Sequence, residues 1–217
     1  ATVFFLVGQA GAEEALVEPA ISEGGRLAVN YKAIWTSPPG RTPGNVSVDA
    51  PLMGNGDIGV CVAGKPESLR FYLSKNDFWR LKSQYGQVGP RVFGYLDLKL
   101  DGLEGATYHV EQRIVDGVTV GMFAKGDLQV RVSSWVAATD NLLVAELSVE
   151  GGETAAEVAL SPATGDGSVS SDGGEGAILW ATRRFEKGEG VDIPTEVAAA
   201  ARLFGADSPA FMLTPGK

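Results

Sequence analysis

The sequence is poor in the residue types from which most metal sites and many catalytic sites are built. Among its 217 residues it has one cysteine, Cys61, and one histidine, His109. A lone cysteine cannot close a disulfide within the chain. Cys61 and His109 lie far apart in the sequence, so they give no zinc-binding pattern. We therefore expect Cys61 to be a small buried side chain and His109 an outward-facing strand residue, and we expect no metal site.

Motifs of nucleophilic catalysis and of phosphate binding are also missing. No G-x-S-x-G pattern appears. GNGDIG at 54–59 spells G-x-G-x-x-G, but it lies among β-favouring residues without the helix that a dinucleotide site requires. Carboxylates remain, among them Asp57, Glu67 and Asp77, and the sequence does not show whether two of them face each other as in a glycosidase. The simplest interpretation is that they are solvated surface acids, so we expect no catalytic residue and no cofactor.

Positive charge is scarce as well. The chain has 18 Lys and Arg against 27 Asp and Glu, a net charge of −9, and no block of like charges. Neutralising phosphates needs a basic surface, so the composition argues against a nucleic-acid partner. No apolar run is long enough to span a bilayer, so we expect no membrane partner either. The hydrophobic content of 44% is that of a globular protein with a sizeable core.

The first twelve residues are similar to the end of a secretory signal. An apolar run, Val3 to Val7, is followed by Ala10-Gly11-Ala12, an A-x-A-like cleavage pattern, and then by Glu13. We interpret residues 1–12 as a signal-peptide remnant and residues 13–30 as an N-terminal extension, which predicts a secreted or periplasmic protein. The alternative is that the apolar run is an edge strand or an amphipathic tail.

From Tyr31 onward the pattern is one of strands and turns. In YLDLKL, residues 95–100, the leucines alternate with polar residues, as expected of a strand with one buried face. Similar segments cover 108–115, 118–123, 128–136 and 142–150, and Asp116-Gly117 has the spacing of a two-residue hairpin turn. Strands at intervals of roughly 8–12 residues predict an all-β fold, a large two-layer antiparallel β-sandwich.

One segment near the C-terminus departs from this pattern. In Asp192–Gly205, Thr195 is a plausible N-cap, an alanine run follows, and Gly205 is a stop signal, which together predict one short helix. The chain then ends on an apolar strand-like piece and a Pro-Gly turn. We expect residues 31–217 to form one domain that is truncated at its C-terminal end.

A specific set of residues lies at the start of that domain. The segments WTSPPG and APLMGNGDIGVCVAGKPESLRFYLSKNDFW combine a W-x-x-P start, a G-N-G-D-I-G turn, an apolar strand and an N-x-D-x-W ending. This combination resembles the N-terminal β-domain of bacterial glycoside hydrolases of the family 95 and family 65 type. The residues that carry the resemblance are Trp35, Pro38, Pro51, Met53, Gly54, Asn55, Gly56, Asp57, Ile58, Gly59, Asn76, Asp77 and Trp79.

The resemblance implies a supersandwich of the galactose-mutarotase-like kind, followed in the full enzyme by an (α/α) barrel that carries the catalytic acid and base. It implies an enzyme that acts on O-glycosidic bonds, similar to an α-L-fucosidase, with a carbohydrate substrate and the downstream barrel of the same chain as partners. This domain would dock on the barrel and line the mouth of the substrate site.

Five residues are the candidate substrate-binding groups: Asn55, Asp57, Asn76, Asp77 and Trp79. Glycines 54, 56 and 59 permit positive φ angles and close backbone approach, and an asparagine in such a turn can keep its amide for a ligand. An indole beside hydrogen-bonding groups suits a sugar ring, which has a C–H face and a hydroxyl rim. The alternative is that Asn55 and Asp57 only satisfy the turn backbone and that Trp79 packs in the core.

Two further functions therefore stay open beside that of an enzyme domain: a β-sandwich that binds carbohydrate without cleaving it, and a purely structural β-sandwich module that stabilises a neighbouring domain.

Overall fold

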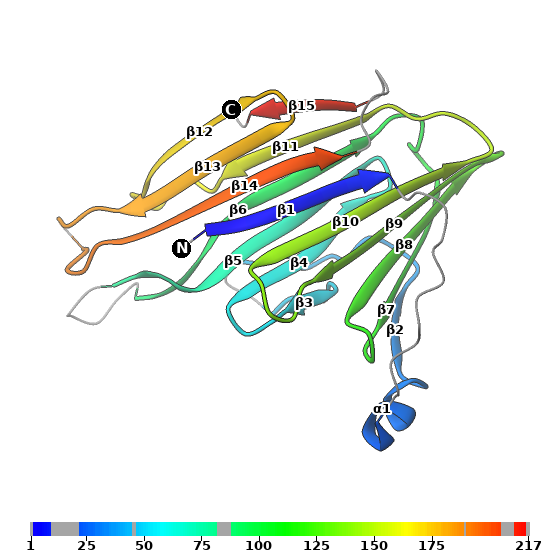
Figure 1. The fold of residues 1–217 in the computed structure, drawn as a ribbon, viewed down its shortest axis with the longest axis horizontal. Coiled ribbons are helices and arrows are strands. Elements are labelled where there is room, and N and C mark those ends of the chain that lie inside the picture. The colour runs from blue at the N-terminus through cyan, green and yellow to red at the C-terminus, as the bar shows by residue number, and fades with distance from the viewer. Residues whose placement is uncertain are drawn as a thin grey trace.

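The computed structural model of the chain describes residues 2–9, 22–44, 47–81, 88–188, 190–204 and 211–215, the first and last of these as backbone only. Almost all of the described elements are strands, and they form two sheets that face each other (Figure 1). This confirms the all-β sandwich. The single helix within the described ranges is α1, Glu23–Ala28, which lies at the N-terminal side of the domain.

The larger sheet has nine strands in the order β12-β13-β14-β1-β10-β9-β8-β7-β2. Their bounds are Val169–Glu175, Ile178–Phe185, Thr195–Phe204, Thr2–Gln9, Leu142–Glu150, Leu128–Val136, Val118–Lys125, Thr107–Arg113 and Lys32–Trp35. The smaller sheet has six strands in the order β15-β11-β6-β5-β4-β3. Their bounds are Phe211–Pro215, Ala156–Pro162, Gly89–Leu100, Ser68–Arg80, Ile58–Lys65 and Leu52–Gly54.

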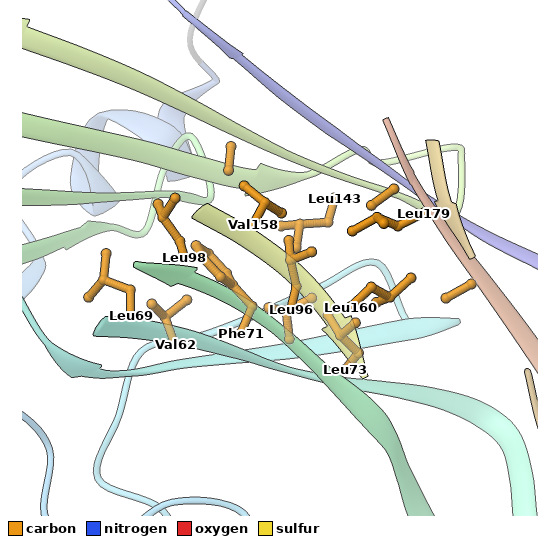
Figure 2. Packing of buried hydrophobic residues seen from close by; sticks show 14 of the residues in the cluster. Val62, Leu69, Phe71, Leu73, Leu96, Leu98, Leu143, Val158, Leu160 and Leu179 are labelled. Carbon is orange, nitrogen blue, oxygen red and sulfur yellow. The ribbon is translucent and has the colours of Figure 1, made fainter. Parts of the chain in front are cut away.

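The core lies between the two sheets and follows the alternation of the strands. On β6 the three leucines 96, 98 and 100 are buried, as predicted. Figure 2 shows residues of the smaller sheet meeting Leu143 of β10 and Leu179 of β13, which come from the larger sheet. Leu160 of β11 lies among them and is fully buried. Cys61 is buried, as expected, on the other face of the smaller sheet, in a second small cluster with Ala50 and Ala63.

The predicted helix at Asp192–Gly205 is wrong. Residues Thr195–Phe204 form strand β14, which pairs with β13 on one side and β1 on the other. Val197 and Leu203 are buried while Glu196 and Arg202 lie on the opposite face, so the segment has the two-residue period of a strand. The alanines between them have a high helix propensity, and pairing on both edges of the strand overrides that weak preference.

Most strand pairs of the sandwich are antiparallel, as predicted, but three are parallel. Strand β1 runs parallel to both of its neighbours, β10 and β14, and β15 runs parallel to β11. Strand β1 contains the apolar run Val3 to Val7 and lies within the nine-stranded sheet, not at an edge (Figure 1). Whether residues 1–12 are also a signal remnant stays a prediction, and residues 10–21 lie outside the described residues.

The hairpin between β7 and β8 has a longer turn than its sequence predicts. Residues 114–117 all lie in the turn, so Asp116-Gly117 is the second half of a four-residue connection. Gly117 takes the positive φ of 66° that the turn requires.

Replacing Leu160 by alanine tests the contact between the sheets. The substitution removes a side chain that is completely buried, so we expect the free energy of unfolding to fall by roughly 2–5 kcal/mol. The matched control is Leu52→Ala on β3, where the side chain is 57% exposed and the loss should stay within about 0.5 kcal/mol. Urea denaturation of both variants measures the difference, and equal losses would contradict the described core.

Candidate functional site

The turn between β3 and β4 contains the glycines that the sequence singled out. Gly56 has a φ of 91°, which favours glycine. Gly54 and Gly59 are not among the positive-φ glycines, and their role is close approach. A Cβ on Gly54 would lie 2.7 Å from the Ile58 carbonyl oxygen, and one on Gly59 would lie 2.8 Å from Ser74 Oγ. The glycines therefore let this turn lie tightly against β4 and β5.

Asn55 holds the turn through hydrogen bonds made by both ends of its amide. Its Nδ2 donates to the carbonyl oxygens of Ala137 and Asp140, at 3.1 and 2.9 Å, and so joins the turn to the connection between β9 and β10. Its Oδ1 accepts from the backbone N–H groups of Asp57 and Ile58, at 3.0 and 2.9 Å. Asn55 thus fills the structural role that the alternative interpretation gave it, and its amide is not kept open for a ligand.

Asp57 and Lys75 form the ionic centre of the site. Lys75 follows Leu69, Phe71 and Leu73 on the apolar face of β5 and is only 5% exposed. Its ammonium group donates to Asp57 Oδ1 and lies 3.3 Å from Asp77 Oδ1. The second oxygen of Asp57 accepts from Asn141 Nδ2 at 2.6 Å. The ammonium group therefore has two carboxylates as partners at the rim of the sandwich.

These contacts set the protonation states of both groups. The hydrogen bond from Lys75, and after it the one from Asn141, hold the pKa of Asp57 below its ordinary value. Burial disfavours the charged form of Lys75, but its hydrogen bonds to Asp57 and Asp77 outweigh that effect and raise its pKa. Asp57 is thus a carboxylate at neutral pH, a state that accepts hydrogen bonds but does not act as a general acid.

A bulge in β5 presents the remaining candidate residues. Pairing with β6 passes from Ser74 opposite Val92 to Trp79 opposite Pro90, so four residues of β5 face a single residue of β6. Asn76 and Asp77 in this bulge are both exposed. Phe78 is completely buried and stacks on Phe185 at 5.5 Å between ring centroids, which anchors the bulge in the core.

Asn76 connects the bulge to the glycine turn. Its Nδ2 donates to the Gly56 carbonyl oxygen at 2.9 Å, and its backbone N–H donates to the Asp57 carbonyl oxygen at 2.8 Å. Trp79 Nε1 donates to the Asn76 carbonyl oxygen, which fixes the indole ring. Trp79 is 37% exposed, so it does not pack fully in the core as the alternative interpretation required.

A hollow of about 730 Å³ opens beside this network. It lies between the glycine turn and the connection from β9 to β10, and its volume falls in the range of ordinary small-molecule sites. The residues that line it are Asn55, Asp57, Ala138, Thr139, Asp140, Asn141 and Leu142. The lining offers carboxylate, amide and hydroxyl groups, which are the groups that bind sugar hydroxyls.

The structure therefore brings all five predicted residues into one hydrogen-bonded network, but in different roles. Asn55 and Asp57 line the hollow, whereas Asn76, Asp77 and Trp79 lie on the bulge beside it. Sequence reasoning missed Lys75 and Asn141. A lysine at an inward position of an alternating strand was a usable signal, because such a residue needs an anionic partner. Asn141 lies 84 residues from Asp57, and no local pattern indicates their contact.

No protein-family model matches the chain, and no curated protein matches it. Within the described residues no group of three or more metal-ligating side chains is found, and no helix there is both long and apolar enough to cross a bilayer.

Replacing Asn55 by alanine should destabilise the rim of the site. The substitution removes the two hydrogen bonds that Nδ2 donates to residues 137 and 140 and the two that Oδ1 accepts within the turn, so we expect a loss of about 2 kcal/mol in the free energy of unfolding. Asn30→Ala, in an exposed turn after α1, is the control, and it should change the free energy of unfolding little. Amide hydrogen exchange should rise at Gly54–Ile58 in the first variant only. Unchanged exchange there would contradict the described role of Asn55.

The Asp57–Lys75 pair should make stability depend on pH in the acid range. Because folding lowers the pKa of Asp57, its contribution is present above the ordinary carboxyl pKa near 3.8 and is lost as pH falls through the folded value. Asp57→Asn should therefore be less stable than the native chain at pH 7, and the gap should narrow below about pH 4. Denaturation at several pH values measures the gap, with Glu104→Gln, an exposed site, as control. A gap that is constant with pH would refute the coupling.

Proposed function

We propose that this chain is the N-terminal β-sandwich domain of a secreted glycoside hydrolase that acts on O-glycosidic bonds of carbohydrates, similar to an α-L-fucosidase. In this proposal the rim formed by the glycine turn and the β5 bulge contacts the sugar. The catalytic acid and base belong to an (α/α) barrel downstream in the full enzyme, and no residue of the present chain takes those roles.

One observation carries the proposal. An open hollow is lined by carboxylate, amide and hydroxyl groups, and hydrogen bonds through Asn76 connect its Asp57 to the partly exposed indole of Trp79. Asp57 keeps lone pairs beyond those used by Lys75 and Asn141, because each carboxylate oxygen can accept two hydrogen bonds. Asp77 has a side chain that is 60% exposed. In the proposal, the exposed part of Trp79 stacks on the C–H face of a pyranose, and these oxygens accept hydrogen bonds from its hydroxyls.

The lowered pKa of Asp57 favours binding over catalysis at this site. A glycosidase needs one carboxyl group that is protonated at the working pH, facing a second carboxylate across the scissile bond. Here Lys75 lies between Asp57 and Asp77 and contacts both, so the two carboxylates share an ammonium group instead of a substrate bond.

A non-catalytic carbohydrate-binding or structural β-sandwich module is the second candidate. The observation in its favour is that the amide of Asn55 and both oxygens of Asp57 already have partners within the chain. If those contacts are the whole purpose of the motif, the structural form of this candidate holds: the rim stabilises the sandwich and the hollow stays without a sugar.

Calorimetric titration with an α-L-fucosylated oligosaccharide tests the proposal. We expect the native chain to bind it and Trp79→Ala to bind at least about tenfold more weakly, because stacking on an indole is lost. Trp180→Ala is the matched control, since Trp180 is an indole of similar exposure, 42%, on β13 and outside the network.

The outcomes separate a sugar-binding rim from a purely structural one and test where the catalysis lies. Binding that both tryptophan variants retain would reject the rim as the sugar site. No binding of any oligosaccharide by the native chain would favour the structural module. Cleavage of the oligosaccharide by this chain alone would overturn the assignment of catalysis to a downstream domain.

A further inference from the structure

The hollow beside the glycine turn has more negative charge around it than its neighbours cancel. Asp57 and Asp140 both line it, and none of the described residues that line it is a lysine, an arginine or a histidine. Lys75 is only 5% exposed, is not part of the lining, and is shared between Asp57 and Asp77. In this network three carboxylates therefore accompany a single ammonium group, and the carboxylate of Asp140 lies on the exposed side.

The side chains that line the hollow use most of their hydrogen-bond donors within the chain. The amide of Asn55 donates to the carbonyl oxygens of residues 137 and 140. Thr139 Oγ1 donates to Asp140 Oδ2 at 2.9 Å, and Asn141 Nδ2 donates to Asp57 Oδ2 at 2.6 Å. Each carboxylate oxygen can accept two hydrogen bonds, so these contacts leave acceptor capacity on both carboxylates. The lining is thus rich in acceptors and poor in side-chain donors.

A ligand that fits this lining has to bring donors of its own. A sugar hydroxyl can donate one hydrogen bond and carries no charge. An ammonium group offers three donors together with a positive charge, and charge-assisted hydrogen bonds are about twice as strong as neutral ones. A carboxylate or a sulfate on the ligand would bring acceptors and negative charge, which the lining repels. The donor inventory and the charge of the hollow therefore favour the same ligand group.

We infer that the saccharide unit held in this hollow is an amino sugar with a free, protonated amino group, which the carboxylates of the lining bind. The inference rests on the proposed function, because it takes the hollow as part of the sugar site, and it adds the kind of sugar. Asp140 determines the preference, since Asp57 already has Lys75 as its ionic partner. Uronic acids and sulfated sugars are excluded from the hollow.

Calorimetric titration of the native chain with three oligosaccharides tests the preference. They have equal length and the same β-1,4 linkage and consist of glucosamine, of glucose or of glucuronic acid. The first two differ only where an amino group replaces a hydroxyl. We expect the glucosamine oligosaccharide to bind at least about fivefold more tightly than the glucose one, because its hydrogen bonds are charge-assisted, and the glucuronic acid one not to bind. Added salt should reduce the preference.

Asp140→Asn tests whether the preference arises in the hollow. The backbone oxygen of Asp140, not its carboxylate, accepts the hydrogen bond from Asn55, so the variant keeps that contact with the turn. We expect the preference for glucosamine over glucose to fall about threefold, because an exposed ion pair is lost. Asp127→Asn is the matched control. It makes the same change in net charge in an exposed turn at the opposite end of β9 and should leave the preference as it is.

The failure of this inference can be told from that of the proposed function. Equal affinity for the glucosamine and glucose oligosaccharides, in a chain that still binds the fucosylated one, would overturn the inference and leave the sugar site standing. A preference that Asp140→Asn and Asp127→Asn reduce equally, or that neither reduces, would reject Asp140 and the hollow as its source. A chain that binds none of these oligosaccharides would overturn both.

Discussion

A lysine on the apolar face of β5 is the constraint on which the rim of this sandwich depends. Lys75 continues the inward series of Leu69, Phe71 and Leu73, and an ammonium group so placed is costly unless it meets negative charge. Asp57 and Asp77 supply that charge from two directions. Asp57 precedes Ile58, which pairs with Lys75 across β4 and β5, and Asp77 lies two residues after Lys75 within the β5 bulge.

That constraint links stability to the chemistry of the site. Asn55 ties the glycine turn to the connection between β9 and β10, so the hollow between them has a defined shape. Asp57 is kept ionised by its partners, and Trp79 is held by its own hydrogen bond and is partly exposed. Groups held in place before binding lose little conformational entropy when a ligand arrives, which is why the proposed sugar contact is assigned to this rim.

Alternation of apolar residues was enough to predict the class of fold and the strands β6 to β10, because their period of two follows from the burial of one face. It failed at β14, where alanines carry no contrast between faces and their neighbours on β1 and β13 decide the structure. Five residues of the network are named from the sequence, but Lys75, Asn141 and the hydrogen bonds that join them to Asp57 are not. Asn55 and Asp57 bond to residues more than eighty positions away, and such contacts depend on how the two sheets meet.

The most direct test of the account is the indole region of the NMR spectrum during titration with an α-L-fucosylated oligosaccharide. The chain has 4 tryptophans, so each Nε1–H signal can be followed separately. The account predicts that the Trp79 signal, together with the side-chain amide signal of Asn141, moves with added sugar while that of Trp180 stays in place. A shift confined to Trp180, or no shift at saturating sugar, would contradict it.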